Sequence, residues 1–213
     1  MTLPNMAFFP QALLPLHIFE PRYRRMLRDV LATNRLFAVA GLDQQPSDPS
    51  LFEPVHRIAS VGIIRACQKN DNGTSNLLLQ GLCRVEIKRI TRDEPYRKIE
   101  FRALTSDPGA MDDDNDSMRR EITRLIQIGQ KLGGTGPTDL TTFLKTVHDP
   151  DAFVDIAAFN LCQDCKLKQR LLETLDVNRR LRLLGEHLRT GIDALKLQRQ
   201  LQGRLSDDHI VDN

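Results

Sequence analysis

The sequence Leu14-Pro15-Leu16-His17-Ile18-Phe19-Glu20-Pro21-Arg22-Tyr23-Arg24-Arg25-Met26-Leu27 joins an apolar segment to an amphipathic helix. Pro21 suits the first turn of a helix, where its missing N–H leaves no hydrogen bond unmade. Apolar residues then recur at helical spacing and predict one buried stripe: Tyr23, Met26, Leu27, Val30 and Leu31. The stretch therefore predicts a strand and loop packed in the interior, followed by a helix with an arginine-rich outer face.

Strand-and-turn chemistry extends outward from this stretch to about residue 107. The Asn70-Asp71-Asn72-Gly73 turn lies between two strand-like runs and predicts a hairpin, because Asn-Gly accepts positive φ at both positions. Gly81 interrupts a continuous β run, which indicates a bulge or a barrel corner. The pattern predicts about six strands. We expect these strands to form a small closed or half-closed barrel, because that arrangement leaves few unpaired strand edges.

The second half of the chain has helical periodicity. We expect a helix over residues 118–132, ended by Gly133-Gly134. Asp149 should cap another helix that has Pro150 in its first turn, and Asp176 should cap the longest one. The apolar stripe of that last helix consists of Val177, Leu181, Leu184, Leu188, Ile192 and Leu195.

These patterns predict an α+β chain with two lobes. The predicted β-domain covers residues 1–106 and the helical bundle covers residues 118–205, with a tail at 206–213. Between the lobes, residues 107–117 carry five acids and no base, so we expect a solvated linker or helix lead-in.

Composition excludes several classes of protein. Thirty basic and 28 acidic residues leave a net charge of +2, which argues against a dedicated nucleic-acid scaffold. Four cysteines are too few for a disulfide scaffold and favour a reducing, cytoplasmic setting. No apolar run approaches the roughly 18 residues that a membrane-spanning helix needs, so no membrane is expected as a partner.

Residues 14–27 resemble the opening of the Lon protease N-terminal domain. Val61-Gly62-Ile63-Ile64 resembles the VGT-like strand of that family, and Gln80-Gly81-Leu82-Cys83-Arg84-Val85 resembles its EG-x-x-R strand, with Gln80 in place of Glu. The run from Asp149-Pro150 to Leu181 resembles its helical lobe and closing helix. The resemblance covers nearly the whole chain and implies a PUA-like small β-barrel with one helix, followed by a helical bundle.

In the full protease this region recognises substrates and supports assembly, while other domains hydrolyse ATP and cleave peptides. The resemblance therefore implies a free-standing, non-enzymatic module that binds exposed apolar segments of unfolded polypeptides. The family normally continues into a long coiled helix where this chain has a short tail. We therefore do not expect this chain to act as a motor that unfolds substrates.

The sequence shows no enzyme motif, so we expect no catalytic residue, no cofactor and no metal. The segment Gly133-Gly134-Thr135-Gly136-Pro137 lacks the Lys and Ser/Thr of a P-loop and is better interpreted as a helix–helix turn. No serine lies in a G-x-S-x-G elbow. Cys162-Gln163-Asp164-Cys165 has redox or half-zinc spacing, but a zinc site needs four ligands and no second pair occurs. We interpret Cys162 as a core residue and Cys165 as half-exposed.

The candidate peptide-binding residues lie in and beside the apolar segment: Leu13, Leu14, Leu16, Ile18, Phe19, Arg22 and Tyr23. Such a segment either packs into the core or presents a patch to a partner, and the sequence leaves both open. An exposed edge would also offer backbone groups for an added strand. His17 in this segment is expected to pack or hydrogen-bond rather than catalyse.

The alternative function is an RNA-binding accessory protein of PUA-like fold. Residues 166–204 carry ten bases against four acids: Lys166, Lys168, Arg170, Arg179, Arg180, Arg182, Arg189, Lys196, Arg199 and Arg204. Because no aromatic residues are interleaved, we interpret them as a solvated helix face and do not expect nucleic acid as a partner. A homodimer through the last amphipathic helix stays open.

Overall fold

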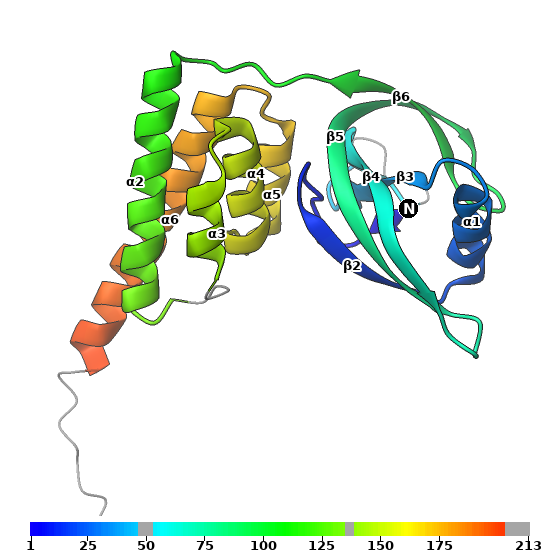
Figure 1. Ribbon diagram of the computed structural model, residues 1–213, viewed down its shortest axis with the longest axis horizontal. Helices are drawn as coiled ribbons and strands as arrows, with labels where there is room; N and C mark the ends of the chain where they lie inside the picture. Colours follow the sequence, from blue (N-terminus) through cyan, green and yellow to red (C-terminus); the bar gives the residue numbers. More distant parts are fainter. Residues whose placement is uncertain (47–52, 135–138, 203–213) are drawn as a thin grey trace, which may run out of the picture.

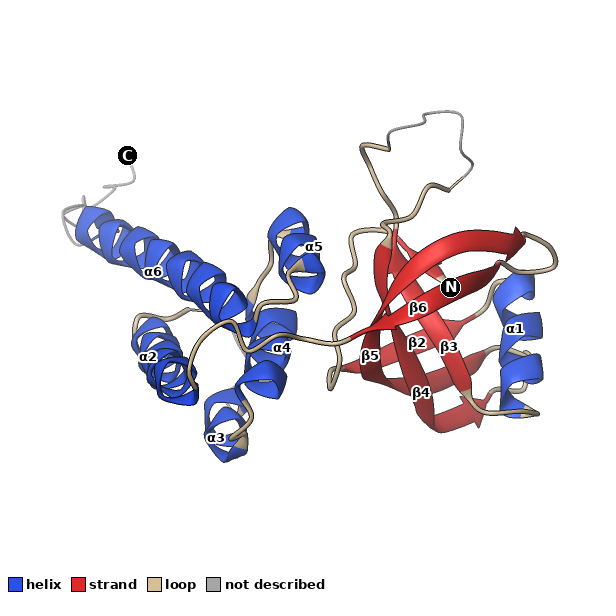
Figure 2. Ribbon diagram, turned by 90° about the horizontal axis from the view of Figure 1, so that it is seen from above, coloured by secondary structure: helices blue, strands red, loops and turns tan. Residues whose placement is uncertain are grey.

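A computed structural model describes residues 1–46, 53–134 and 139–202. It consists of a β-lobe and a helical lobe lying side by side (Figures 1 and 2). The β-lobe contains helix α1 (Pro21–Leu31) and the strands β1 (Thr2–Leu3), β2 (Leu13–Ile18), β3 (Leu36–Gly41), β4 (Ile58–Lys69), β5 (Ser75–Arg92) and β6 (Lys98–Leu104). The six predicted strands and the one predicted helix are therefore confirmed.

The strands form one sheet in the order β1-β3-β4-β5-β2, with β6 also paired to β5. β5 is long enough to pair with β2 through its first half and with β6 through its second half. The sheet therefore curls strongly (Figure 2). Among the described strands the hydrogen-bonded order does not return to its start, so the sheet is not closed and the predicted closed barrel is not confirmed.

The bulge predicted at Gly81 is confirmed. Val61 pairs with Cys83 and Gly62 pairs with Gly81, which leaves Leu82 as an extra residue in β5. A side chain at position 81 would collide with the carbonyl oxygen of Phe9. Glycine is needed here because the segment before β2 crosses β5 at backbone contact distance.

The hairpin between β4 and β5 is confirmed, but its turn differs from the expected one. Only Gly73 has a positive φ, at 77°, and Asn72 does not. Asn70 N donates to Thr74 O at 2.9 Å, so the connection is longer than a two-residue turn. Loops of this length are commonly a type I turn followed by one left-handed residue, here Gly73, so only one positive φ is needed.

The helical lobe contains α2 (Asp112–Lys131), α3 (Leu140–Thr146), α4 (Pro150–Leu161), α5 (Cys165–Glu173) and α6 (Val177–Gln202). The three termini predicted from local signals are confirmed. Gly133 follows α2 with a φ of 79°. Asp149 accepts hydrogen bonds from the N–H groups of Asp151 and Ala152, and Asp176 accepts one from Arg179 N.

Helix α2 begins six residues before the expected start at Met118. Asp112, Asp113 and Asp114 lie in its first turn, where the positive end of the helix dipole stabilises negative side chains. The acidic run is therefore mostly helix, and only residues 107–111 lie outside the helix, between the lobes.

The two lobes share a hydrophobic core. Phe8 and Phe9 of the β-lobe lie in the same buried cluster as Ala158 of α4 and Leu171 and Leu172 of α5. A second cluster fills the helical lobe: Ile122, Ile126, Leu140, Leu144, Phe153, Val154, Ile156, Ala157, Val177, Leu181 and Leu184. Helix α4 contributes to both clusters, so burial of apolar surface holds the lobes together.

Candidate functional site

The predicted binding residues of β2 alternate between two faces of the sheet. Leu14 and Ile18 are buried in the core, whereas Leu13 is 52% exposed. Phe19, directly after the strand, is 60% exposed. Leu16 is half-buried and packs against the core. This is the alternation of a strand with one face in the core and one face in solvent.

Two further predicted residues have internal partners. Tyr23 is buried, and its hydroxyl accepts a hydrogen bond from Thr2 N at 3.1 Å. Arg22 donates from Nη1 and Nη2 to the two carboxylate oxygens of Glu53, both at 2.9 Å, and from Nε to Glu20 at 2.8 Å. The Arg22 hydrogen bonds hold the pKa of Glu53 below its usual range. Both side chains stabilise the β-lobe itself.

Burial therefore removes Leu14, Ile18 and Tyr23 from the candidate surface. What remains is the outward side of β2 and its continuation: Leu13, Pro15, His17 and Phe19. The His17 and Phe19 rings stack with centroids 6.0 Å apart. His17 Nδ1 lies 2.7 Å from Asn76 Oδ1, so His17 makes the hydrogen bond that was expected of it.

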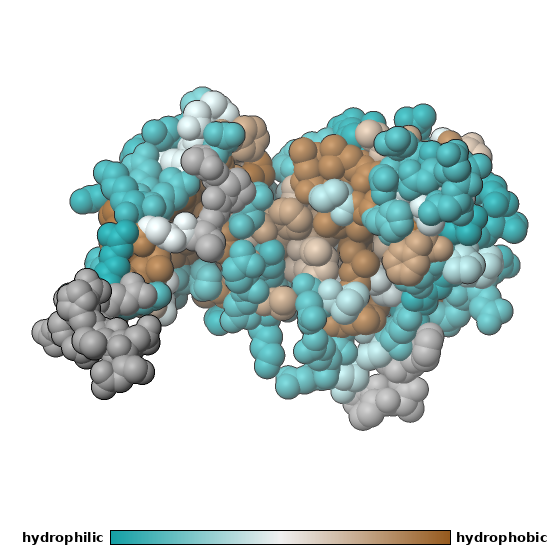
Figure 3. All heavy atoms as spheres, turned by 90° about the horizontal axis from the view of Figure 1, so that it is seen from below, coloured by the Kyte–Doolittle hydropathy of each residue, from teal (hydrophilic) through white to brown (hydrophobic). Residues whose placement is uncertain are grey.

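Neighbouring strands extend this surface. Leu13 is opposite Gln80, and Pro15 is opposite Leu78, which in turn is opposite Ala66 of β4. We call the following set the β2 face: Leu13, Pro15, His17, Phe19, Asn76, Leu78, Gln80, Ala66 and Gln68. Figure 3 shows hydrophobic residues gathered over the β-lobe when it is viewed from below, the side on which β2 lies in Figure 1.

The free edge of β2 is poorly suited to pairing with an added strand. β2 ends the strand order, so only one of its edges is paired within the described sheet. Pro15, in the middle of the strand, has no N–H to donate to an added strand. This arrangement favours recognition through side chains of the β2 face over addition of a strand.

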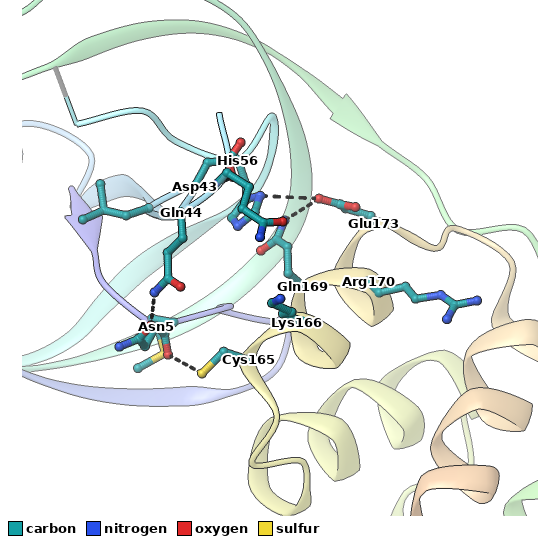
Figure 4. A pocket seen from close by; sticks show the side chains of 12 residues that line it. Asn5, Asp43, Gln44, His56, Cys165, Lys166, Gln169, Arg170 and Glu173 are labelled. Carbon is teal, nitrogen blue, oxygen red and sulfur yellow. Dashed lines mark hydrogen bonds and ion pairs between the residues drawn. The ribbon is translucent and has the colours of Figure 1, made fainter. Parts of the chain in front are cut away.

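A second candidate is a polar pocket of about 260 Å³ between the lobes (Figure 4). Asn5, Gln44 and His56 reach it from the β-lobe, and Cys165 and Glu173 reach it from α5. Its polar groups largely bind one another. Gln44 Nε2 donates to Asn5 Oδ1 at 2.6 Å, Cys165 Sγ lies 3.3 Å from Asn5 O, and His56 Nδ1 lies 3.9 Å from Glu173 Oε1. Within the described part of the chain, no hydrogen bond joins His56 to Cys165.

The C-x-x-C spacing has a structural explanation. Cys162 is fully buried at the end of α4, and Asp164 caps α5 by accepting from the N–H groups of Lys166 and Leu167. Burial raises the pKa of the Cys162 thiol, which disfavours the reactive thiolate. Cys165 is exposed rather than half-exposed. Among residues 1–46, 53–134 and 139–202, no three His, Cys, Asp or Glu side chains are placed to hold a metal ion.

The bases of residues 166–204 do not form one uniform face. Arg180 is fully buried. Arg189 pairs with Glu121 of α2 at 2.6 Å, and Lys196 pairs with Asp193 at 3.3 Å. Burial lowers the pKa of Lys168, whose Nζ lies 5.1 Å from the centre of the Phe159 ring. The RNA-binding alternative stays a prediction, and fewer free cations support it than the sequence suggests.

None of the described helices is both long enough and apolar enough to span a membrane.

Comparison with known proteins places these features in a family. Residues 1–190 match the family described as the ATP-dependent protease La (LON) substrate-binding domain. The Lon protease of Desulfosudis oleivorans is 26% identical over 212 residues, and that of Dictyoglomus thermophilum is 25% identical over 208 residues. Each alignment covers 98% of this chain and 26% of the relative, so the chain spans about a quarter of those proteins.

Two solved structures have the same fold. The N-terminal domain of the Mycobacterium avium complex Lon protease matches with a TM-score of 0.67 at 16% identity, covering 88% of this chain and 95% of that one. The Lon N-terminal domain protein from Xanthomonas campestris matches with a TM-score of 0.57 at 18% identity, covering 86% and 94%. With the family match over residues 1–190, these likenesses show that the chain belongs to the LON substrate-binding domain family.

Proposed function

We propose that this chain binds exposed apolar segments of polypeptides through the β2 face and catalyses no reaction. The observation that carries the proposal is the exposure of Leu13 and Phe19 on a strand whose alternate residues are buried. Covering such side chains releases roughly 25 cal/mol per Å² of apolar surface removed from water. Unfolded polypeptides expose apolar side chains that could cover this surface. The family that the chain matches is described as a substrate-binding domain.

The geometry of β2 supports contact through side chains. Outward-facing residues of a strand repeat at about 7 Å, which matches the spacing of alternate side chains in an extended ligand. The stacked ring pair His17–Phe19 closes one end of the row, and Leu13 marks the other end. Because Pro15 lacks an N–H, the ligand is held by apolar contact and by side-chain amides such as that of Asn76.

The chemistry of the described residues agrees with a binding role. Among the described residues, the histidine side chains contact Asn76 and Glu173, and none hydrogen-bonds to a serine or a cysteine. A nucleophile needs a base within hydrogen-bond reach. The polar pocket between the lobes uses its groups for internal contacts that join α5 to the β-lobe.

The test compares two exposed phenylalanines. Phe19→Asp places a charge on the β2 face, and Phe143→Asp places the same charge at a side chain 52% exposed on α3. Binding to reduced, carboxymethylated α-lactalbumin, an unfolded polypeptide, is measured by fluorescence anisotropy, and circular dichroism checks that both variants fold. We expect Phe19→Asp to weaken binding about tenfold, since a charge on the most exposed aromatic side chain of the β2 face removes an apolar contact of the hot-spot kind. Equal binding by both folded variants removes the β2 face from the site.

We also propose a cytoplasmic location. All four cysteines are free thiols, and free thiols persist where glutathione and thioredoxin keep them reduced. Localisation of a fluorescent fusion tests this.

The homodimer through α6 remains a prediction. Leu197 and Leu201 near the end of α6 are each 57% exposed, at a spacing of one helical turn. Sedimentation velocity over a hundredfold concentration range distinguishes monomer from dimer.

A further inference from the structure

An arginine is fixed over the β2 face by a bulge. In β4, Ile64 is opposite Leu79 and Ala66 is opposite Leu78, so Arg65 has no partner in the strand register. Its Nε donates to Gln80 Oε1 at 2.6 Å. Gln80 is the residue opposite Leu13. The guanidinium is therefore held by a neutral amide beside the apolar row, with its remaining N–H groups available.

Other cations lie near the ends of the neighbouring strands. Arg35 lies directly before β3, and its carbonyl accepts from Ile64 N beside the bulge. The Arg24 guanidinium of α1 lies against Gly73 in the hairpin turn, while Lys69 is opposite buried Ser75 and therefore lies on the other side of the sheet from the β2 face. Within the described part of the chain, Arg24, Arg35 and Arg65 form no ion pair with a carboxylate.

Acids are few at this border. Asp71 lies in the hairpin turn, and Glu20, after Phe19, is already paired with Arg22 at 2.8 Å. Some cations elsewhere on the β-lobe do have carboxylate partners. Arg89 pairs with Glu100 at 2.6 Å and Arg25 pairs with Asp29 at 3.6 Å. The β2 face is thus an apolar row with the Arg65 guanidinium beside it.

We propose that the β2 face selects apolar segments that are flanked by acidic residues, and that Arg65 is the residue that sets this preference. The inference rests on the proposed function, because it assigns a substrate class to the same site. An apolar side chain of the ligand covers Leu13, while a neighbouring Asp or Glu accepts from the free N–H groups of Arg65. Arginine suits this role because its planar fork matches a carboxylate. A basic flank meets repulsion instead.

The test uses three labelled 12-residue peptides with one identical Phe- and Leu-rich centre, flanked by two Glu, two Gln or two Lys residues. Anisotropy gives Kd for the wild-type chain, Arg65→Gln and Arg179→Gln. Arg179→Gln removes the same charge from an exposed position of α6, away from the β2 face. We expect the Glu-flanked peptide to bind wild type about threefold more tightly than the Gln-flanked one, in line with an exposed ion pair. The Lys-flanked peptide should bind most weakly.

Arg65→Gln should make the Glu- and Gln-flanked peptides equal in affinity, and Arg179→Gln should keep the difference. Raising the salt concentration should shrink the difference in wild type while the Gln-flanked peptide binds as before. Equal Kd values for the three peptides, or an unchanged difference in Arg65→Gln, overturn this inference but leave apolar binding intact. Absence of binding by every peptide, or binding unaffected by Phe19→Asp, overturns the proposed function instead.

Discussion

Arg84 of β5 holds Asp155 of α4 through two parallel hydrogen bonds, Nη1 to Oδ2 and Nη2 to Oδ1, both 2.6 Å long. Each side chain is 2% exposed, and Arg180 of α6 donates to the same carboxylate. Arg84 Nε also donates to the carbonyl of Leu172 at the end of α5, at 2.9 Å. Burial raises the pKa of the Asp155 carboxyl, and the charges of Arg84 and Arg180 act against that effect. This two-point pair fixes how the lobes meet, because parallel hydrogen bonds tolerate little displacement.

The first prediction concerns this pair. Arg84→Met should lower the free energy of unfolding by about 3–5 kcal/mol, because it leaves a buried carboxylate with one cation where it had two. Urea denaturation followed by circular dichroism measures the loss. Arg89→Met, in the same strand, removes an exposed ion pair with Glu100 and should change stability by less than about 1 kcal/mol. Similar effects of the two substitutions would show that the buried pair contributes no more than a surface one.

A second prediction concerns acid stability and the Arg22–Glu53 pair. Hydrogen bonds from Arg22 lower the pKa of Glu53 below the usual value of a glutamate, so the unfolded chain binds more protons than the folded chain in that range. The stabilisation by ionised Glu53 is fully present above the pKa that Glu53 has in the unfolded chain. It is lost as the pH falls through the pKa that Glu53 has in the folded protein. Glu53→Gln should therefore lose less stability than wild type between pH 6 and about pH 3. Parallel losses in the two proteins would assign the acid sensitivity to other carboxyls.

Local chemistry made much of this fold predictable. The stripe of α1 and the caps at Asp149 and Asp176 depend on residues close together in the sequence, and all are observed. The bulge at Gly81 was marked by a glycine within a β run, although its cause is the distant segment at Phe9. Helix α2 was misplaced because its acidic start has the composition of a linker. That composition also favours the positive end of a helix.

The sequence predicts which segment carries the candidate site, but not which of its side chains are exposed. Leu13, Leu14, Leu16, Ile18 and Phe19 are apolar on both faces of β2, so no alternation of polar and apolar residues marks the buried side. Arg84 and Asp155 are 71 residues apart and lie on different elements, so no sequence spacing links them. The position of Arg65 over Gln80 depends on a register shift in β4, which only the paired strands reveal.

The third prediction separates the two thiols of the C-x-x-C segment. Cys165 is exposed, whereas Cys162 is buried with a raised pKa, so iodoacetamide should alkylate Cys165 at least about tenfold faster in the folded protein. Mass spectrometry of timed digests measures both rates, and the same digests in denaturant should show equal rates. Purified protein should contain less than stoichiometric zinc. One zinc per chain, or protection of both thiols by added zinc, would contradict the structural interpretation of this segment.

The last prediction uses two glycines with opposite surroundings. A Cβ at Gly191 in α6 would have no atom within 4 Å, so Ala fits there and should stabilise the helix by about 0.5–1 kcal/mol through its better helix propensity. A Cβ at Gly81 in β5 would meet the backbone of Phe9, which lies in the core shared by the two lobes. Gly81→Ala should therefore lower the melting temperature or prevent folding, while Gly191→Ala raises it. The Gly81 contact lies between the β2 segment and β5. If the Gly81→Ala protein still folds, it should therefore bind polypeptides more weakly at the β2 face. Gly191→Ala should leave that binding unchanged.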